Sequence, residues 1–201
     1  MSITLPARRL VLAEVLPAGL TRSGVTILLG AALTALAAQV SFPVPGSPVP
    51  VTGQTFAVLF TAAALGPARG LAAQGLYLAM GAVGLPVFAG ATHGTGVIFG
   101  ASGGYLIGFL VAALITGYGA RHGADRSPVR TLLLFALASV VIYVIGTTWL
   151  CLDTGMSLSA GISAGVTPFL PGDAAKALLA AGLLPGAWWL TGRGAGRGSA
   201  R

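Results

Sequence analysis

Charged residues are scarce in this sequence. Only 7% of the 201 residues are Asp, Glu, Lys or Arg, whereas a soluble domain usually carries roughly 25%. A water-facing surface cannot be built from so few charges. No charged residue occurs between Arg22 and Arg69 or between Arg69 and Arg121, and each gap exceeds the ~20 apolar residues that cross a bilayer. The sequence therefore predicts an all-α integral membrane protein that crosses the membrane several times.

Cysteine is rare, and several catalytic motifs are missing. Cys151 is the only cysteine, which excludes an internal disulfide and lacks the spacing of a metal site. Neither an HExxH zinc motif nor a GxxxxGK(S/T) phosphate-binding loop occurs. We therefore expect no metal, no cofactor and no ATPase site in this chain. A secretory signal peptide is not expected either, because Glu14 and Pro17 interrupt the first apolar run.

Helix-breaking residues and charges divide the chain into six hydrophobic segments. A proline and a charge between Gly66 and Gly70 predict a tight turn, so the second and third segments are expected to be separate transmembrane helices. The third segment is short for a ~30 Å hydrocarbon core, and the 85–99 segment after it is expected to fold back into the protein. The six segments lie at about 24–41, 52–67, 70–84, 100–118, 131–151 and 173–191.

Basic residues fall almost entirely on one side of this arrangement. By the positive-inside rule that side is cytoplasmic, so both termini and the 119–130 loop are expected in the cytoplasm. A single membrane domain at 24–191 would follow the segment 1–23 and precede a basic tail at 192–201. The net charge of +7 then reflects topology and attraction to inner-leaflet lipid, and no nucleic-acid partner is expected. Ten of the eleven basic residues lie on this side: Arg8, Arg9, Arg22, Arg69, Arg121, Arg126, Arg130, Arg193, Arg197 and Arg201.

The exception is Lys176, which this topology places near the outer end of the last span, three residues after Asp173. Ionisable groups within a span cost roughly 2.5–3.5 kcal/mol at mid-membrane and by default mark a ligand or ion path. Two structural explanations compete with that reading. Asp173 could cap the helix N-terminus, and Lys176 could extend to the outer headgroups. A cation in the first turn opposes the helix dipole, so a ligand-binding role for the pair is favoured.

Other segments on the same side have the composition of a pocket wall. The stretch FPVPGSPVPVTGQT contains four prolines, which favours a stiff wall or lid. Glycines in the 85–99 segment and in GASGGYLIGF would let backbone approach a ligand closely. Gln54, Phe88 and Tyr105 are candidate wall residues, with ordinary helix packing as the alternative for each. His93 is interpreted as a loop residue first and a pocket residue second.

Several separate motifs occur in the order of a known family. VSFPVPGSPVPVTGQT, YLAMGAVGLPVFAG, GGYLIGF and TPFLPGDAAKALLA together resemble the BioY family, the biotin-binding S components of energy-coupling factor (ECF) transporters. The resemblance extends over about residues 24–191. It implies a six-helix protein of the cytoplasmic membrane that captures biotin from outside and is not an enzyme. It also implies partners, namely a transmembrane T component and two cytoplasmic ATPase subunits.

The resemblance implies site residues as well. The family's biotin-contacting acidic and lysine residues correspond to Asp173 and Lys176, and the tyrosine of its GGYL motif corresponds to Tyr105. The family usually reads Gly-Pro-Thr before Gly-Gly-Tyr, where this chain has Gly-Ala-Ser at 100–102, so Ser102 keeps a hydroxyl while the proline is lost. The carboxylate can accept from the ureido N–H groups of biotin. The ammonium can donate either to the ureido carbonyl or to the biotin carboxylate.

Ala31 and Ala35 lie four residues apart, on one face of the first predicted helix. Small residues at this spacing permit the close approach of another helix in lipid. Packing within the protein explains the spacing equally well, because Ala and Gly are plentiful throughout the chain. In the family such residues face the T component, so the resemblance favours a partner interface.

Two other functions compete with biotin uptake. The GASGG sequence also matches GxSxG, and a Gly-x-Ser-Gly sequence in a six-span protein resembles a rhomboid-type intramembrane serine protease. Such an enzyme needs a base within hydrogen-bond reach of Ser102, but the only later histidine is His122, in the predicted cytoplasmic loop. An S component for another vitamin is the stronger alternative, because pocket residues transfer between relatives less readily than a fold does.

Overall fold

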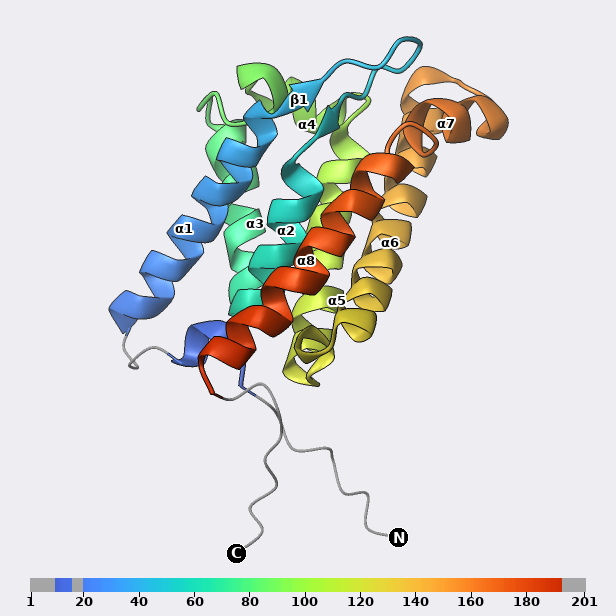
Figure 1. Cartoon of the computed structure of the whole chain (residues 1–201). Coiled ribbons are helices and arrows are strands. Elements are labelled where there is room, and N and C mark those ends of the chain that lie inside the picture. The colour runs from blue at the N-terminus through green and yellow to red at the C-terminus, as the bar shows by residue number, and fades with distance from the viewer. Residues whose placement is uncertain (1–9, 16–19, 193–201) are drawn as a thin grey trace, which may run out of the picture.

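Six long helices correspond to the six predicted segments. The computed structural model describes residues 10–15 and 20–192, and within these ranges the six helices run side by side as a bundle (Figure 1). Each begins and ends within a few residues of its predicted segment, because Gly, Pro and charged residues interrupt the apolar runs. The helices are α1 (Leu20–Gln39), α2 (Gln54–Leu65), α3 (Pro67–Ala82), α5 (Gly103–Arg121), α6 (Pro128–Thr154) and α8 (Leu170–Leu190).

The outer surface of the bundle is apolar. Of the described helices, α5 and α6 are long and apolar enough to cross a membrane, while α1 and α2 contain shorter apolar stretches. On α6 the exposed residues Leu133, Leu137, Val140 and Val144 recur every three or four positions, so they form one stripe along the helix. Soluble proteins rarely expose an apolar surface of this extent. The stripe therefore suits contact with lipid.

Short elements close one end of the bundle. The four-proline stretch connects β1 (Ser41–Phe42) to β2 (Val51–Thr52), and the two strands pair antiparallel as a hairpin. α4 (Thr95–Phe99) and α7 (Leu158–Gly165) lie at the same end (Figure 1). The sequence did not predict α7, whose eight residues are too few to form a periodic apolar pattern.

The 85–99 segment folds inward over only a small part of its length. Val87 and Phe88 are buried, whereas the residues of η2 (Ala89–Ala91) and those up to 96 are mostly exposed or half-buried. Gln39, at the end of α1, holds this segment in place. Its Nε2 donates to Phe88 O at 3.3 Å, and its Oε1 accepts from the N–H of Ala91 at 3.1 Å.

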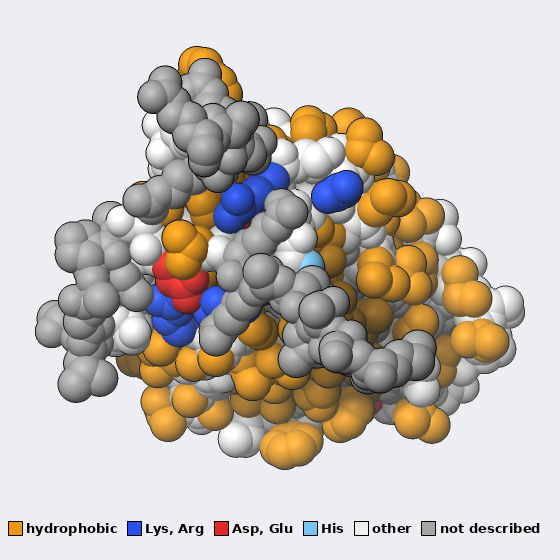
Figure 2. All heavy atoms as spheres, turned by 90° about the horizontal axis from the view of Figure 1, so that it is seen from below, with side chains coloured by type: hydrophobic (Ala, Val, Ile, Leu, Met, Phe, Trp, Pro, Cys, Tyr) orange, Lys and Arg blue, Asp and Glu red, His pale blue; other side chains and the backbone are white. Residues whose placement is uncertain are grey.

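Charged side chains gather at the opposite end of the bundle (Figure 2). Glu14, in η1 (Leu12–Val15), accepts hydrogen bonds from Arg69 at 3.2 Å and from Arg121 at 2.7 Å. Arg126 donates to a backbone carbonyl of the same N-terminal segment. Glu14 therefore ties the segment before α1 to the start of α3 and the end of α5. Five of the basic residues that are predicted to be cytoplasmic lie outside the described part of the chain: Arg8, Arg9, Arg193, Arg197 and Arg201.

These contacts set the pKa of Glu14. Burial raises the pKa, but the hydrogen bond from Arg121, the N–H of Val11 and the charges of Arg121 and Arg69 together lower it below its ordinary value of 4.5. A carboxylate with a lowered pKa stabilises the fold above its unfolded-state pKa, and that contribution is lost as the pH falls through the folded-state pKa. We expect Glu14→Gln to lower the melting temperature in detergent at neutral pH, and the difference from wild type to shrink below pH 4.5.

The matched control for this prediction is Asp153→Asn, which changes an exposed carboxylate near the end of α6. It should leave the melting temperature unchanged at both pH values. An effect of Glu14→Gln that is the same at neutral and acid pH would contradict the ionic role of Glu14.

The turn between α2 and α3 is tight, as predicted. Gly66 has φ +83°, a left-handed conformation that favours glycine. Pro67 begins α3, a position where the missing proline N–H costs little. α5 passes this turn closely, since a Cβ on Gly117 would lie 2.4 Å from Pro67 N and 2.6 Å from Gly66 C. α2 and α3 are therefore separate helices, and their turn packs against α5 through backbone contact.

The structure corrects the assignment of Ala31 to a partner interface. Ala31 has no exposed surface and belongs to the hydrophobic core, and Ala35 is partly buried against the same core. The outward face of α1 instead carries large apolar residues, of which Leu28 is 55%, Leu29 62% and Leu36 69% exposed. The small residues allow α1 to pack closely within the bundle. Packing inside the protein was the alternative that the four-residue spacing left open.

Candidate substrate-binding site

A cavity of about 300 Å³ lies at the end of the bundle that the β1–β2 hairpin closes. This volume is at the lower limit of the ~300–1,000 Å³ typical of small-molecule sites. Pro48, Val49 and Pro50 form part of its wall, in agreement with the prediction from the proline-rich stretch. The six residues assigned to a substrate site from the sequence all line this one cavity: Gln54, Phe88, Ser102, Tyr105, Asp173 and Lys176.

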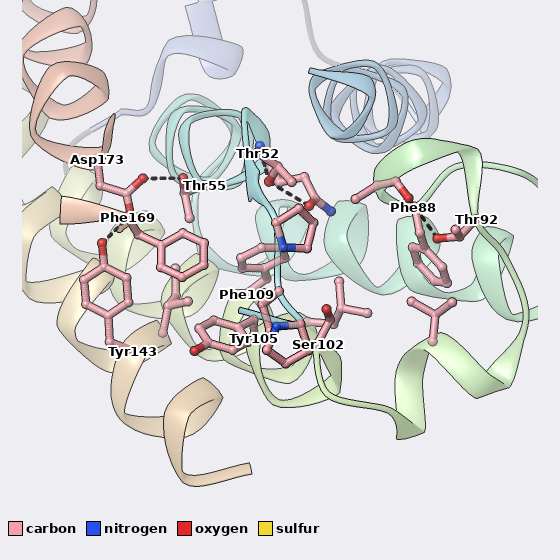
Figure 3. Close-up of a pocket in the computed structure, with 18 of the residues that line it drawn as sticks. Thr52, Thr55, Phe88, Thr92, Ser102, Tyr105, Phe109, Tyr143, Phe169 and Asp173 are labelled. Carbon is pink, nitrogen blue, oxygen red and sulfur yellow. Dashed lines mark hydrogen bonds between the residues drawn. The ribbon is translucent and has the colours of Figure 1, made fainter. Parts of the chain in front are cut away.

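The charged residues of the cavity wall, Asp173 and Lys176, belong to one hydrogen-bonded cluster. Figure 3 shows the bonds from Thr55 and Tyr143 to Asp173. Asp173 Oδ1 accepts from Thr55 Oγ1 at 2.8 Å and from Lys176 Nζ at 2.6 Å. Asp173 Oδ2 accepts from Tyr143 Oη at 2.5 Å. Lys176 Nζ also donates to Thr52 O and to Thr55 Oγ1, both at 2.7 Å. The cluster therefore joins α8 to α6, to the hairpin and to the start of α2.

This geometry differs from both structural explanations for the charged pair. Asp173 is 8% exposed, and its carboxylate accepts from side chains of α2, α6 and α8. The N-cap residue of α8 is Phe169, which makes no side-chain cap. The Lys176 side chain is 18% exposed, and its ammonium donates to Thr52, Thr55 and Asp173. Removing such a pair from water is costly, so its place in a cavity wall favours a binding role.

Gln54 and Phe88 are held in the wall by partners of their own. Gln54 Nε2 donates to Tyr77 Oη at 2.6 Å, and Gln54 Oε1 accepts from Thr52 Oγ1 at 2.8 Å. The Phe88 ring packs edge-on against Tyr77, with centroids 5.5 Å apart. Both side chains therefore pack within the protein and also line the cavity. Packing within the protein and lining of a pocket, the two interpretations that the sequence left open, therefore both hold for these residues.

Tyr105 and Ser102 lie where the chain enters α5. Tyr105 Oη donates to Gly165 O at 2.8 Å, so the hydroxyl is engaged within the protein while the residue lines the cavity. Ser102 immediately precedes α5 and makes no side-chain cap. Trp149 Nε1 donates to Gly100 O at 3.0 Å. This bond anchors the Gly-Ala-Ser stretch, which lacks the proline usual in the family that the sequence resembles.

Tyr143, Thr55 and Phe169 are among the cavity-lining residues that the sequence reasoning missed. Tyr143 lies near the middle of α6, where a hydroxyl in an apolar run was an available signal of function. Thr55 and Phe169 carry no comparable signal. The ring of Phe169 lies 6.0 Å from that of Tyr105 and 6.4 Å from that of Tyr143, centroid to centroid. The contribution of Thr55 and Phe169 to the site depends on the side-by-side placement of α2, α5, α6 and α8, which local patterns do not reveal.

The histidines lie away from the cavity lining. His93 is exposed in the loop after η2, in agreement with its interpretation as a loop residue. His122 Nδ1 lies 2.8 Å from Tyr118 O at the charged end of the bundle. Ser102 therefore has no histidine beside it in the cavity wall to act as a base. The described residues also contain no group of three or more His, Cys, Asp or Glu side chains that could hold a metal ion.

The fold and the cavity together are those of a small-molecule-binding protein with an apolar outer surface. A helical bundle with an apolar outer surface encloses a small-molecule pocket, and a buried ion pair forms one part of the pocket wall. Comparison with known sequences then identifies the family, because the sequence model of the BioY family matches residues 8–193. The chain belongs to the BioY family.

Individual relatives and a solved structure agree with this assignment. The chain is similar to "Biotin transporter BioY2" of Lactococcus lactis subsp. cremoris (strain MG1363), with 36% identity over 153 residues, 76% of this chain and 82% of the relative. It is 38% identical over 154 residues to the "Probable biotin transporter BioY" of Pyrococcus horikoshii, 77% of this chain and 88% of the relative. The fold matches the crystal structure of an "S-component for biotin from an ECF-type ABC transporter" with a TM-score of 0.76 and 24% identity, over 82% of this chain and 89% of that one.

Proposed function

We propose that this protein binds biotin in the cavity beside Asp173 and Lys176 and serves biotin uptake as the S component of an ECF-type transporter. One observation carries the proposal: the residues that the family resemblance assigns to biotin line a single cavity of about 300 Å³. The relatives are named biotin transporters, and the matched fold is that of an S component for biotin. The function is therefore transport and not catalysis.

The chemistry of biotin suits this lining. Its ureido ring has two N–H donors and one carbonyl acceptor, its thioether ring is apolar, and its tail ends in a carboxylate. Asp173 can accept from an N–H, and Lys176 can donate to an oxygen. Phe88, Tyr105 and Phe169 line the cavity and can cover the apolar ring and the alkyl chain, as aromatic walls do in small-molecule sites.

We further propose that the six helices cross the cytoplasmic membrane as one domain, with 1–23 and 192–201 as flanking segments. Ten of the eleven basic residues would then be cytoplasmic, and the charged end that contains Glu14 and Arg121 would face inward. The hairpin end would face outward, where the cavity can receive biotin from outside the cell.

Cysteine labelling tests this topology. In a Cys151→Ser background, we expect a membrane-impermeant thiol reagent added to intact cells to label Ser47→Cys and to leave Ala124→Cys unlabelled. Permeabilised cells provide the control, because both positions should then react. If Ala124→Cys is labelled in intact cells and Ser47→Cys is not, the orientation in the membrane is the opposite of the proposed one.

We propose that partners supply the energy for uptake. The sequence has no phosphate-binding loop of its own, so we propose a transmembrane T component and two cytoplasmic ATPase subunits as partners. The matched S component comes from a transporter of this type. The exposed apolar residues of α1, including Leu28, Leu29 and Leu36, offer a surface for the T component or for membrane lipid.

Direct binding separates this function from its alternatives. We expect the purified chain in detergent to bind biotin in isothermal calorimetry and not to bind riboflavin or thiamine. Preference for another vitamin would make it an S component of different specificity, and a folded protein without biotin binding would overturn the proposal. Cleavage of a membrane substrate that is lost in Ser102→Ala would support a rhomboid-like protease instead.

A further inference from the structure

The two ends of the cavity differ in chemistry. Asp173 and Tyr143 lie at one end, and Phe88 and Thr92 lie at the other (Figure 3). Asp173 and Lys176 are the charged residues among the described ones that line the cavity, and they form one ion pair. An elongated ligand therefore meets a polar, hydrogen-bonding surface at one end and a mainly apolar surface at the other.

The geometry of the ion pair determines which ligand group it accepts. Lys176 Nζ has three donors, and it already donates to Thr52 O, Thr55 Oγ1 and Asp173 Oδ1. A ligand oxygen can bind Lys176 only by replacing one of these contacts. Asp173 Oδ2 accepts from Tyr143 Oη, and a carboxylate oxygen has room for a second donor. The end of the cavity at Asp173 therefore favours a ligand N–H over a ligand oxygen.

A ligand carboxylate is disfavoured at this end for an electrostatic reason. Asp173 Oδ1 lies only 2.6 Å from Lys176 Nζ, so an anion that reaches the ammonium also approaches the Asp173 carboxylate. The repulsion between the two carboxylates offsets much of the attraction to the ammonium, and both interactions are stronger in a largely buried site than in water. A neutral group with N–H donors, such as a cyclic urea, meets no such repulsion. A cyclic urea ring therefore fits this end, and a tail attached to the ring would extend toward Phe88 and Thr92 (Figure 3).

The opposite end consists of apolar and hydroxyl groups. Phe88 and Thr92 lie there (Figure 3), and Thr92 Oγ1 already donates to Ala89 O at 2.9 Å. His93, next to Thr92 in the chain, is exposed and does not belong to the lining. These groups can contact an alkyl tail but supply no counter-charge for its carboxylate.

We infer that the pocket selects its ligand by the neutral ring and not by the charge of the tail, so biotin with an amidated carboxyl group is also a ligand. This inference rests on the proposed function. It widens the substrate class from a single acid to ring-intact biotin derivatives with small uncharged tails. The ureido N–H groups, which face Asp173, are the specificity-determining part of the ligand.

Competition in detergent with three ligands tests the inference. Biotin and its primary amide should bind the wild-type protein with affinities within about threefold of each other. Biotin methylated on a ureido nitrogen should bind more than about tenfold more weakly, since a hydrogen bond to a charged group is lost. The His93→Ala variant should leave the ratio of acid to amide affinity unchanged.

Each outcome separates the inference from the proposed function. Amide binding that is more than about tenfold weaker than acid binding overturns the inference while biotin binding itself stands. If that discrimination disappears in His93→Ala, the histidine recognises the tail. A folded protein that binds neither biotin nor its amide overturns the proposed function.

Discussion

Asp173→Asn is expected to weaken biotin binding by about ten- to a hundredfold. Asn keeps the size of the side chain but replaces one carboxylate oxygen by an N–H₂ group, which cannot accept from Thr55, Tyr143 or a ligand N–H. Lys176 also loses the counter-charge that lies 2.6 Å away. Losing a hydrogen bond to a charged group costs about 1.5–3 kcal/mol, which corresponds to that range of affinity.

Calorimetry and thermal unfolding in detergent would measure affinity and stability for the same samples. Lys176→Met should lose affinity in the same range, and Lys176→Arg should lose some of it, because a planar guanidinium cannot reproduce the three contacts of the ammonium. Asp153→Asn is the matched control at an exposed carboxylate and should bind biotin like wild type. If all the Asp173 and Lys176 variants bind biotin with wild-type affinity, the pair does not contribute to biotin binding.

Gly117→Ala is expected to destabilise the fold by about 1–3 kcal/mol, the usual cost of overpacking. The added Cβ would lie 2.4 Å from Pro67 N and 2.6 Å from Gly66 C. These are backbone atoms of the α2–α3 turn, so no side chain can rotate away to relieve the contact. The turn has to separate from α5, and the melting temperature in detergent should fall.

Gly75→Ala is the matched control for that change. Gly75 lies within α3, and a Cβ at this position would meet no atom within 4 Å. Alanine in a helix interior is more stable than glycine by roughly 0.5–1 kcal/mol, so the melting temperature should stay the same or rise. Equal melting temperatures for the two variants would show that α5 does not pack on the turn through its backbone.

The helices were predictable because their signals are local. Apolar runs, and the Gly, Pro and charged residues that end them, predict all six long helices and the turn at Gly66. Which face of α1 turns outward was not predictable in the same way. The spacing of Ala31 and Ala35 places them on one side of a helix, but it does not say whether that side faces another protein or the core. Burial decides this, and burial depends on where α2 and α3 lie.

The site was predictable to the extent that its residues are unusual for their surroundings. Asp173 and Lys176 are charges at the start of an apolar helix, so composition alone draws attention to them. Of the groups that complete their hydrogen bonds, Thr52 and Thr55 are ordinary in their own segments, whereas Tyr143 places a hydroxyl in an apolar run. They become part of the site because β2, α2, α6 and α8 meet at one end of the bundle. That information lies in tertiary packing and not in any single stretch of sequence.

Unequal helix lengths determine the depth at which the cavity lies. At about 1.5 Å per residue, the 12 residues of α2 span roughly 18 Å and the 27 residues of α6 roughly 40 Å. α2 begins only at Gln54 and is shorter than α6, which leaves the space under the hairpin that the cavity occupies. A hydrocarbon core is about 30 Å thick, and in the proposed topology the ligand would then sit below the headgroup plane, flanked by lipid on the far side of the helices. Biotin would have to shed its water before it could reach Asp173.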